Sequence, residues 1–356
     1  MTHLQPAYAE PAAETAQPQR IVFHATGGEY FRIWIVNLLL TIVTLGIYSA
    51  WAKVRRNQYF YSSTELAGSS FEYHGNPVAI LKGRIVALLV FAAYSAAGKF
   101  SPLAGVVMGL AMAALIPWFM WKSLQFRLHN TSYRGLRFHF DGELADAYTA
   151  YLGRPMLNFI TLGLALPFVH QRMKAYQHNE SRYGNARFAF DASVGSFYKL
   201  YAAGAAVMLA GLGLVGWLVF SAASLPDGAQ GAAGARAAET GLMVLLAYAW
   251  IFLVYPLFMN MLQNLIWNHT SLEQHRFRCD MKWGRLIFIT FTNYLAIVCT
   301  LGLFIPFAKV RAMRYWLESI VLQPEGSLDQ FVAASTPPVG ATGEGLVDVM
   351  DFDLSL

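Results

Sequence analysis

Three arginine–tyrosine pairs occur in this chain at one spacing, and they are the side chains best suited to bind an anion. They are Arg55 with Tyr59, Arg172 with Tyr176, and Arg311 with Tyr315. A spacing of four residues places both members of a pair on one face of a helix. Because a guanidinium binds phosphate or carboxylate through charge-assisted hydrogen bonds, the pairs predict contacts with anionic lipid headgroups or an anionic solute. The alternative is that these basic and aromatic residues only anchor the protein at the membrane interface.

A Thr-Leu-Gly motif precedes each pair. The three copies are Thr44, Leu45 and Gly46; Thr161, Leu162 and Gly163; and Thr300, Leu301 and Gly302. Glycine permits a turn, and a threonine hydroxyl can bond to a freed backbone carbonyl, so the motif indicates a break in a helix. Transporters place ion or substrate sites at such breaks. A simple kink or a notch for helix packing is the alternative interpretation.

The repeat is longer than its motif. A gapless offset of 139 aligns residues 117–176 with 256–315, and an offset of 117 aligns 44–73 with 161–190. Internal repetition of this length predicts a duplicated membrane fold with a partial third copy. We expect a repeated domain over residues 21–317, in units of about 21–140, 138–280 and 275–317. Residues 1–20 are expected to form a disordered tail, and residues 318–356 an acidic disordered tail that could bind a partner.

The composition predicts an integral membrane protein. Hydrophobic residues make up 56% of the chain and charged residues only 13%, whereas soluble domains carry about 25% charged residues. Seven apolar segments stand out, at about 30–52, 78–98, 102–121, 145–169, 193–221, 240–265 and 284–308. Stretches that alternate with a period of two predict short strands on one membrane face; they are residues 22–24, 71–73, 138–140, 188–190 and 277–279. The expected fold is mainly α, a polytopic integral membrane protein with internally repeated apolar helices and short cytoplasmic β-strands.

The distribution of lysine and arginine decides between two topologies. The connections at 98–101 and 222–239 contain one basic residue each, whereas the other connections contain three to five. Basic connections stay in the cytoplasm. This rule is satisfied if the three Thr-Leu-Gly segments re-enter the membrane without crossing it. We therefore favour four spanning helices in two hairpins, at 78–121 and 193–265, with both termini cytoplasmic. Seven spans with an imperfect charge bias are the alternative.

Signals for other chemistry are weak. The sequence contains no zinc-protease spacing, no phosphate-binding glycine loop and no nucleophile elbow. Cys279 and Cys299 do not suggest a disulfide framework. The net charge of +5 comes from residues that flank apolar segments, so it does not indicate nucleic-acid binding. We expect no catalytic residues, no metal and no cofactor.

Two blocks of the sequence resemble a known family. Residues 29–37 (EYFRIWIVN) and 44–55 (TLGIYSAWAKVR), with their looser later copies, are similar to the YjgN family of bacterial inner-membrane proteins. The resemblance extends over about residues 21–317. It implies a location in the bacterial inner membrane, and it implies no catalytic residues because the family is a domain of unknown function.

Three functions are compatible with these observations. The first, which we favour from the sequence, is a transporter or channel-like protein for a small or anionic solute, with a site where the three broken segments converge. The second is a membrane scaffold or accessory subunit that recruits a partner through its cytoplasmic face. The third, an enzyme acting on lipids, lacks any visible nucleophile, carboxylate pair or metal cluster.

Overall fold

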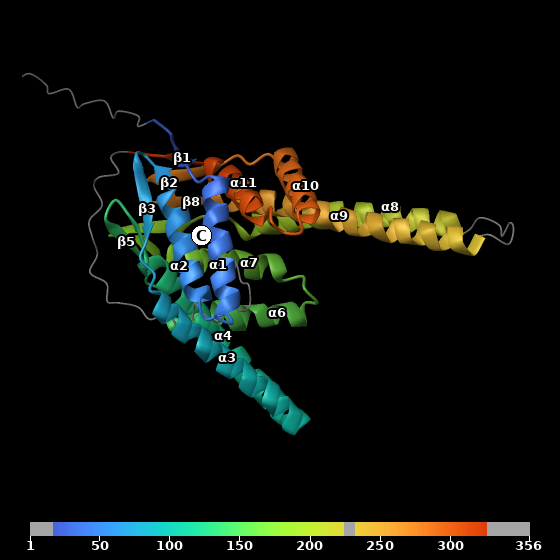
Figure 1. Ribbon diagram of the computed structural model, residues 1–356, viewed down its shortest axis with the longest axis horizontal. Helices are drawn as coiled ribbons and strands as arrows, with labels where there is room; N and C mark the ends of the chain where they lie inside the picture. Colours follow the sequence, from blue (N-terminus) through green and yellow to red (C-terminus); the bar gives the residue numbers. More distant parts are fainter. Residues whose placement is uncertain (1–16, 224–231, 326–356) are drawn as a thin grey trace, which may run out of the picture.

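Ten short antiparallel strands close into a small barrel, and helical hairpins extend from one end of it (Figure 1). The computed structural model describes residues 17–223 and 232–325. The strand order around the barrel is β1-β10-β9-β8-β7-β6-β5-β4-β3-β2. The strands are β1 (Gln19–Phe23), β2 (Thr64–Leu66), β3 (Ser69–Tyr73), β4 (Thr131–Tyr133), β5 (Leu136–Phe140), β6 (Ser181–Tyr183), β7 (Ala186–Phe190), β8 (Thr270–Leu272), β9 (His275–Cys279) and β10 (Ile320–Gln323).

Each odd-numbered strand leads into a helical hairpin, and the next strand leaves that hairpin. The helices are α1 (Gly27–Val43), α2 (Ser49–Ser62), α3 (Pro77–Phe100), α4 (Pro102–His129), α5 (Leu144–Tyr148), the π-helix η1 (Thr149–Gly153), α6 (Arg154–Ile160), α7 (Leu166–Asn179), α8 (Val194–Ala223), α9 (Ala232–Asn268), α10 (Trp283–Cys299) and α11 (Ile305–Glu318). The described chain thus consists of five strand–hairpin–strand modules. The first two repeat units expected from the sequence correspond to two modules each, one with a short hairpin and one with a long hairpin, and the partial third unit corresponds to the last module alone.

Equivalent backbone hydrogen bonds close the base of every hairpin. In each module, the amide just after the odd strand donates to the carbonyl just before the even strand. The pairs are His24 to Ser63, His74 to Asn130, Asp141 to Glu180, Asp191 to His269 and Asp280 to Ser319, at 2.8–3.3 Å. The five modules are therefore equivalent at the base of the hairpin, although their hairpins differ in length.

Hydroxyl side chains end the second helix of four hairpins. The hydroxyls of Thr64, Thr131, Ser181 and Thr270 each donate to the carbonyl four residues earlier, at 2.6–2.9 Å. Such a bond satisfies a carbonyl that the end of the helix would leave unpaired. Three of these residues belong to triplets that fit the glycosylation pattern, such as Asn130-Thr131-Ser132. In the structure these triplets lie where α4, α7 and α9 end and the next strand begins.

The four expected membrane spans are confirmed by length and composition. They are Pro77–Phe100, Pro102–His129, Val194–Ser221 and Gly241–Asn268. They form two hairpins, α3–α4 and α8–α9, which extend from the barrel in different directions (Figure 1). At most 17% of the residues in each apolar window are buried, so most of their apolar surface remains available to lipid.

The structure shortens both expected tails at the ends that adjoin the membrane domain. Strand β1 already starts at Gln19, and strand β10 runs to Gln323. Strand β10 pairs with β1 on one side and with β9 on the other. These two terminal strands therefore close the barrel, and a closed barrel leaves no exposed strand edge. The remaining tail predictions, for residues 1–16 and 326–356, lie outside the described residues.

Candidate functional site

Each Thr-Leu-Gly motif forms the turn at the tip of a short helical hairpin. The motifs join α1 to α2, α6 to α7, and α10 to α11. The strands that flank each hairpin belong to the same barrel, and β1 pairs directly with β2. A segment that crossed the membrane once would place its two flanking strands on opposite faces. The pairing therefore rules out the seven-span topology and agrees with segments that return to the side they left.

The turn satisfies its own backbone polar groups. Thr44 Oγ1 donates to the carbonyl of Leu40 at 2.7 Å and accepts from the amide of Tyr48 at 2.9 Å. Thr161 and Thr300 make the same two bonds, at 2.7–3.0 Å. The glycine amides donate to carbonyls five residues earlier at 2.7–2.8 Å. The expected role of the threonine hydroxyl is thus confirmed, and these bonds occupy the groups that a bound solute would otherwise use.

Backbone geometry explains the glycine in the motif. Gly46, Gly163 and Gly302 have φ angles of 93°, 87° and 92°, which glycine adopts without steric cost. The preceding leucines also have positive φ angles, near 50°, a conformation that costs a non-glycine residue about 1–2 kcal/mol. The turn is therefore a defined structure rather than a loose kink.

The tips of the short hairpins are apolar and almost fully exposed. Leu45, Leu162 and Leu301 have exposed fractions of 94%, 92% and 95%. Because these leucines contact so little protein, the three tips do not pack together into a shared site. Exposed apolar surface of this kind is unfavourable in water at about 25 cal/mol per Å², and it suits a lipid environment.

The three tyrosines bind the base of their own hairpins. The hydroxyls of Tyr59, Tyr176 and Tyr315 donate to the carbonyls of Thr26, Glu143 and Lys282, at 3.2, 3.0 and 2.9 Å. Those three acceptors are the N-cap residues of α1, α5 and α10. Burial raises the pKa of Tyr59 and of Tyr176, so both hydroxyls stay protonated and act as donors. The tyrosines clamp the two arms of each hairpin together.

The three arginines are exposed, and their surroundings differ. Arg311 Nη1 donates to Asn293 Oδ1 at 2.8 Å, and Nη2 donates to Thr292 Oγ1 at 3.3 Å. The Arg172 guanidinium lies 5.5 Å from the centre of the Phe168 ring. In the described part of the chain, Arg55 makes no equivalent bond to Asn37, whose buried Oδ1 has no hydrogen-bond partner. The arginines are thus available for an external anion, one from each short hairpin.

The residues two positions before these arginines do not add a uniform positive charge. His170 Nδ1 shares a 2.9 Å hydrogen bond with the Tyr201 hydroxyl. Burial, with a smaller effect from Lys174, lowers the pKa of His170 to about 4, so this histidine is neutral at physiological pH. Lys309 Nζ lies 5.9 Å from the centre of the Phe60 ring, across the α11–α2 boundary.

A collar of inward-facing side chains fills the barrel, a feature that sequence reasoning missed. Ten residues at one level pair across neighbouring strands: Ile21 with Leu66, Phe71 with Tyr133, Phe138 with Tyr183, Phe188 with Leu272, and Phe277 with Leu322. The centres of consecutive phenylalanine rings, from Phe71 to Phe277, lie 6.3–6.5 Å apart in stacked arrangements. The repeated phenylalanine of the odd strands was the available signal.

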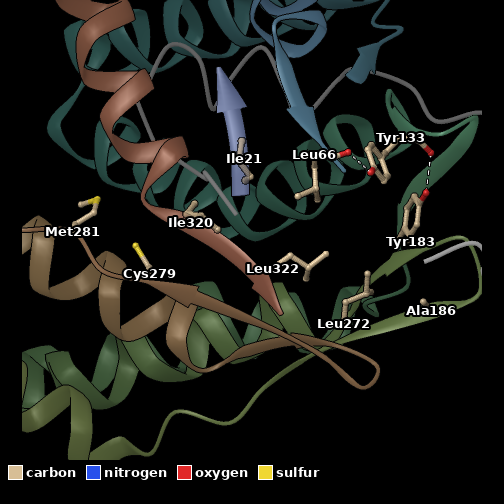
Figure 2. Packing of buried hydrophobic residues seen from close by; sticks show 10 residues of the cluster. All are labelled: Ile21, Leu66, Tyr133, Tyr183, Ala186, Leu272, Cys279, Met281, Ile320 and Leu322. Carbon is tan, nitrogen blue, oxygen red and sulfur yellow. Dashed lines mark hydrogen bonds between the residues drawn. The ribbon is translucent and has the colours of Figure 1, made fainter. Parts of the chain in front are cut away.

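Two tyrosine hydroxyls tie the collar together (Figure 2). Tyr133 donates to the carbonyl of Leu66 at 2.6 Å, and Tyr183 donates to the carbonyl of Tyr133 at 2.9 Å. Since Leu66, Tyr133 and Tyr183 hold equivalent positions in successive modules, the bonds run from one module to the next. The two buried hydroxyls are thereby paired with the backbone of the barrel.

We searched residues 17–223 and 232–325 for a metal site and for disulfides. No group of three or more histidine, cysteine, aspartate or glutamate residues there could hold a metal ion. Cys279 is buried and Cys299 is exposed, and neither forms a disulfide within that range.

The barrel, the four spans and the short hairpins define a multi-pass membrane protein. Over residues 18–349 the chain matches the family described as bacterial protein of unknown function (DUF898), and it belongs to that family. It is similar to the inner membrane protein YjgN of Escherichia coli O157:H7, with 33% identity over 155 residues, covering 43% of this chain and 38% of that protein. It is also similar to YjgN of Salmonella typhimurium, with 34% identity over 150 residues, covering 41% and 37%.

These matches give the location but no activity. The aligned region spans less than two-fifths of the length of the curated relatives. No solved structure matches the chain. The protein is a multi-pass protein of the bacterial inner membrane, with its long apolar helices in contact with the lipid bilayer.

Proposed function

We propose that this protein is a membrane scaffold that holds a small β-barrel at the cytoplasmic face of the inner membrane and recruits a protein partner there. The observation that carries the proposal is the filled barrel. A solute that moved along the barrel axis would have to displace the collar, in which Tyr133 and Tyr183 are buried and hydrogen-bonded to the barrel backbone. A platform requires such rigidity, whereas a conduit requires an open or gated lumen.

The arrangement of the helices supports the same proposal. The spans are largely unburied and diverge as two separate hairpins (Figure 1), whereas a carrier needs helices packed around a site. The three Thr-Leu-Gly turns expose their leucines and satisfy their own backbone groups. A convergent solute site at these turns therefore has no geometric support.

The outer face of the barrel offers a polar surface for a partner. Side chains alternate across a strand, so the residues between the inward-facing positions point outward. On β7 and β9 these include Arg187, Arg276 and Arg278, all exposed. Exposed arginines are frequent anchors of protein interfaces.

Photo-crosslinking in cells tests the recruitment of a partner. A photoreactive amino acid at position 187 or 276 should give a discrete protein adduct, whereas the same group at Phe91, on the exposed face of α3, should give only lipid adducts. The adduct should disappear when Arg278 is replaced by Glu. Equal protein adducts from position 91, or none from the barrel positions, would argue against a scaffold.

A transporter or channel-like protein is the second candidate. It is favoured by buried amide atoms without hydrogen-bond partners, such as Gln171 Oε1 and Asn260 Nδ2, which could meet water or a solute. The discriminating experiment is the conductance of planar bilayers that contain the purified protein. A scaffold whose barrel lies outside the bilayer predicts baseline current, both for the unmodified protein and for the variant in which Tyr133 and Tyr183 are replaced by Ala. Current through the unmodified protein would favour the channel.

A further inference from the structure

We propose that the three Thr-Leu-Gly hairpins are single-leaflet insertions: their turns reach the bilayer midplane, and Arg55, Arg172 and Arg311 contact the phosphates of the barrel-side leaflet. The proposal rests on the membrane placement that the scaffold function assumes, and it assigns a lipid-binding role to the site described above. The partner is an anionic phospholipid, recognised by its phosphate and by its acyl chains.

The spacing of the motif matches half a bilayer. Each arginine lies 11 residues after the threonine of its turn, but only the last six of these steps, from the start of α2, α7 or α11, are helical. The preceding helix gives the depth in the first and third hairpins, because Asn37 and Asn293 donate to carbonyls three residues before the arginine. Seven further residues lead from each asparagine to the threonine of the turn, so the threonine lies about 15 Å from the level of the arginine at 1.5 Å per residue. The hydrocarbon core is about 30 Å thick, so its half-thickness is about 15 Å. When the arginine lies at the phosphate boundary, the leucine and glycine of the turn therefore lie near the midplane. The same spacing occurs in all three hairpins.

The α3–α4 hairpin, measured from the level of the three arginines, is long enough to cross the whole hydrocarbon core. Arg55, Arg172 and Arg311 lie nine residues before the strands β2, β6 and β10, and Lys122 lies nine residues before β4. From Pro102 at the tip of the α3–α4 hairpin to Lys122 there are 20 residues, or about 30 Å. The short hairpins thus reach half as deep as a hairpin that spans the membrane, measured from one common level.

The chemistry of the tips suits the midplane. Hydrocarbon contains no water to satisfy backbone groups, so irregular backbone survives there only when it is satisfied internally. The threonine hydroxyls and the glycine amides supply those bonds in all three turns. The leucine at the apex of each turn presents an apolar side chain that is more than 90% exposed.

The arginine level suits the phosphates. All three arginines are exposed, and Arg311 is oriented by its hydrogen bonds to Asn293 and Thr292. The tyrosine clamps lie four residues closer to the barrel, about 6 Å further out. The barrel then stands just above the headgroups, and the short hairpins displace lipid only from the barrel-side leaflet.

Depth-dependent fluorescence quenching tests the insertion. Single cysteines at positions 45, 162, 301 and 55 would carry an environment-sensitive fluorophore in liposomes whose lipids bear a nitroxide at the headgroup or deep in the acyl chain. We expect the deep nitroxide to quench positions 45, 162 and 301 most strongly, and the headgroup nitroxide to quench position 55. A label at Ser101, at the tip of a spanning hairpin, should be reached by an aqueous quencher from the far side. Aqueous quenching of position 45, 162 or 301 from either side would overturn the proposal.

Lipid selectivity tests the phosphate contacts. Association of spin-labelled phosphatidylglycerol relative to phosphatidylcholine should fall about fivefold or more in the R55Q/R172Q/R311Q variant. The matched Lys variant should retain most of the preference, and the R187Q variant on the barrel should be unchanged. An unchanged preference in the triple Gln variant would overturn the phosphate assignment. Conductance by a protein whose turns nevertheless lie at the midplane would instead reject the scaffold function alone.

Discussion

Asn293 on α10 and Arg311 on α11 join the two arms of their hairpin, with Arg311 Nη1 donating to Asn293 Oδ1 at 2.8 Å. Asn293 Nδ2 also donates to the carbonyl of Ala308 at 3.1 Å, across from α10 to α11. The equivalent Asn37 reaches the carbonyl of Ala52 only at 3.5 Å, and its Oδ1 is unpaired. The last short hairpin is thus tied more tightly than the first, although their motifs match.

This difference predicts unequal costs of substitution. Asn293→Ala should lower the free energy of unfolding by about 1–3 kcal/mol, because it removes two hydrogen bonds made by a buried side chain. Asn37→Ala should cost clearly less, because its single bond is long. Chemical denaturation in detergent micelles, followed by circular dichroism, gives both values. Equal losses of unfolding free energy would mean that the two amides contribute equally to stability, which would contradict the difference in their hydrogen bonds.

The tyrosine clamps should contribute to stability. Tyr176→Phe removes the hydrogen bond to the Glu143 carbonyl and keeps the ring, so it should cost about 0.5–1.5 kcal/mol. Tyr315→Phe should cost more, because the Tyr315 hydroxyl both donates to the Lys282 carbonyl and accepts from the Lys282 amide. Tyr294→Phe is a suitable control because Tyr294 is exposed on α10. Thermal unfolding of the purified variants is the measurement. If only the control lost stability, the clamps would have no structural role.

The glycine of the turn should resist substitution. Gly46→Ala places a Cβ on a residue with φ of 93°, which should destabilise the protein by about 1 kcal/mol or more. Gly213→Ala, within α8, meets no atom within 4 Å of the added Cβ and should be neutral or stabilising by up to about 1 kcal/mol. Expression and thermal unfolding of the two variants check the contrast. A neutral Gly46→Ala variant would contradict the turn geometry.

Stability should fall in mild acid because of buried histidines on α7. Burial lowers the pKa of His178 to about 3 and that of His170 to about 4, whereas an unfolded histidine has a pKa near 6.5. The unfolded chain therefore binds more protons below pH 6.5, and each histidine removes up to about 1.4 kcal/mol of stability per pH unit until its folded pKa is reached.

The free energy of unfolding at pH 7.5 and at pH 5.5 measures this effect. The unmodified protein should be less stable at pH 5.5, and His178→Asn should reduce the difference between the two values. A pH-independent stability would show that these histidines are hydrated enough to titrate normally.

Much of the helical architecture was predictable from the sequence. The long apolar runs and the poorly charged connections at 98–101 and 222–239 indicated two spanning hairpins, and the spans agree with them. The return of the Thr-Leu-Gly segments was predicted from the charge asymmetry of the connections and from the second segment, which is too short to span the membrane. These features depend on local composition and on chain order, which a single sequence displays directly.

The barrel and the role of the tyrosines were not predictable in the same way. Even-numbered strands such as β2 and β4 have three residues, too few to show a period of two, and β10 lies within an apparently acidic tail. Tyr59, Tyr176 and Tyr315 each bond to a residue 33 positions away. Spacing within a helix cannot reveal such partners, so an interfacial anchor and a base clamp look alike in sequence.

A closed barrel and returning short hairpins both require all ten strands to lie on one side of the membrane. Single cysteines at Glu65, Arg187 and Gln323, on three strands of the barrel, and at Ser101, between α3 and α4, would be labelled with a membrane-impermeant reagent in sealed vesicles of known orientation. We predict that the three barrel positions label from one side only and that Ser101 labels only from the other. Labelling of any barrel position from the Ser101 side would contradict the closed barrel and the returning hairpins together.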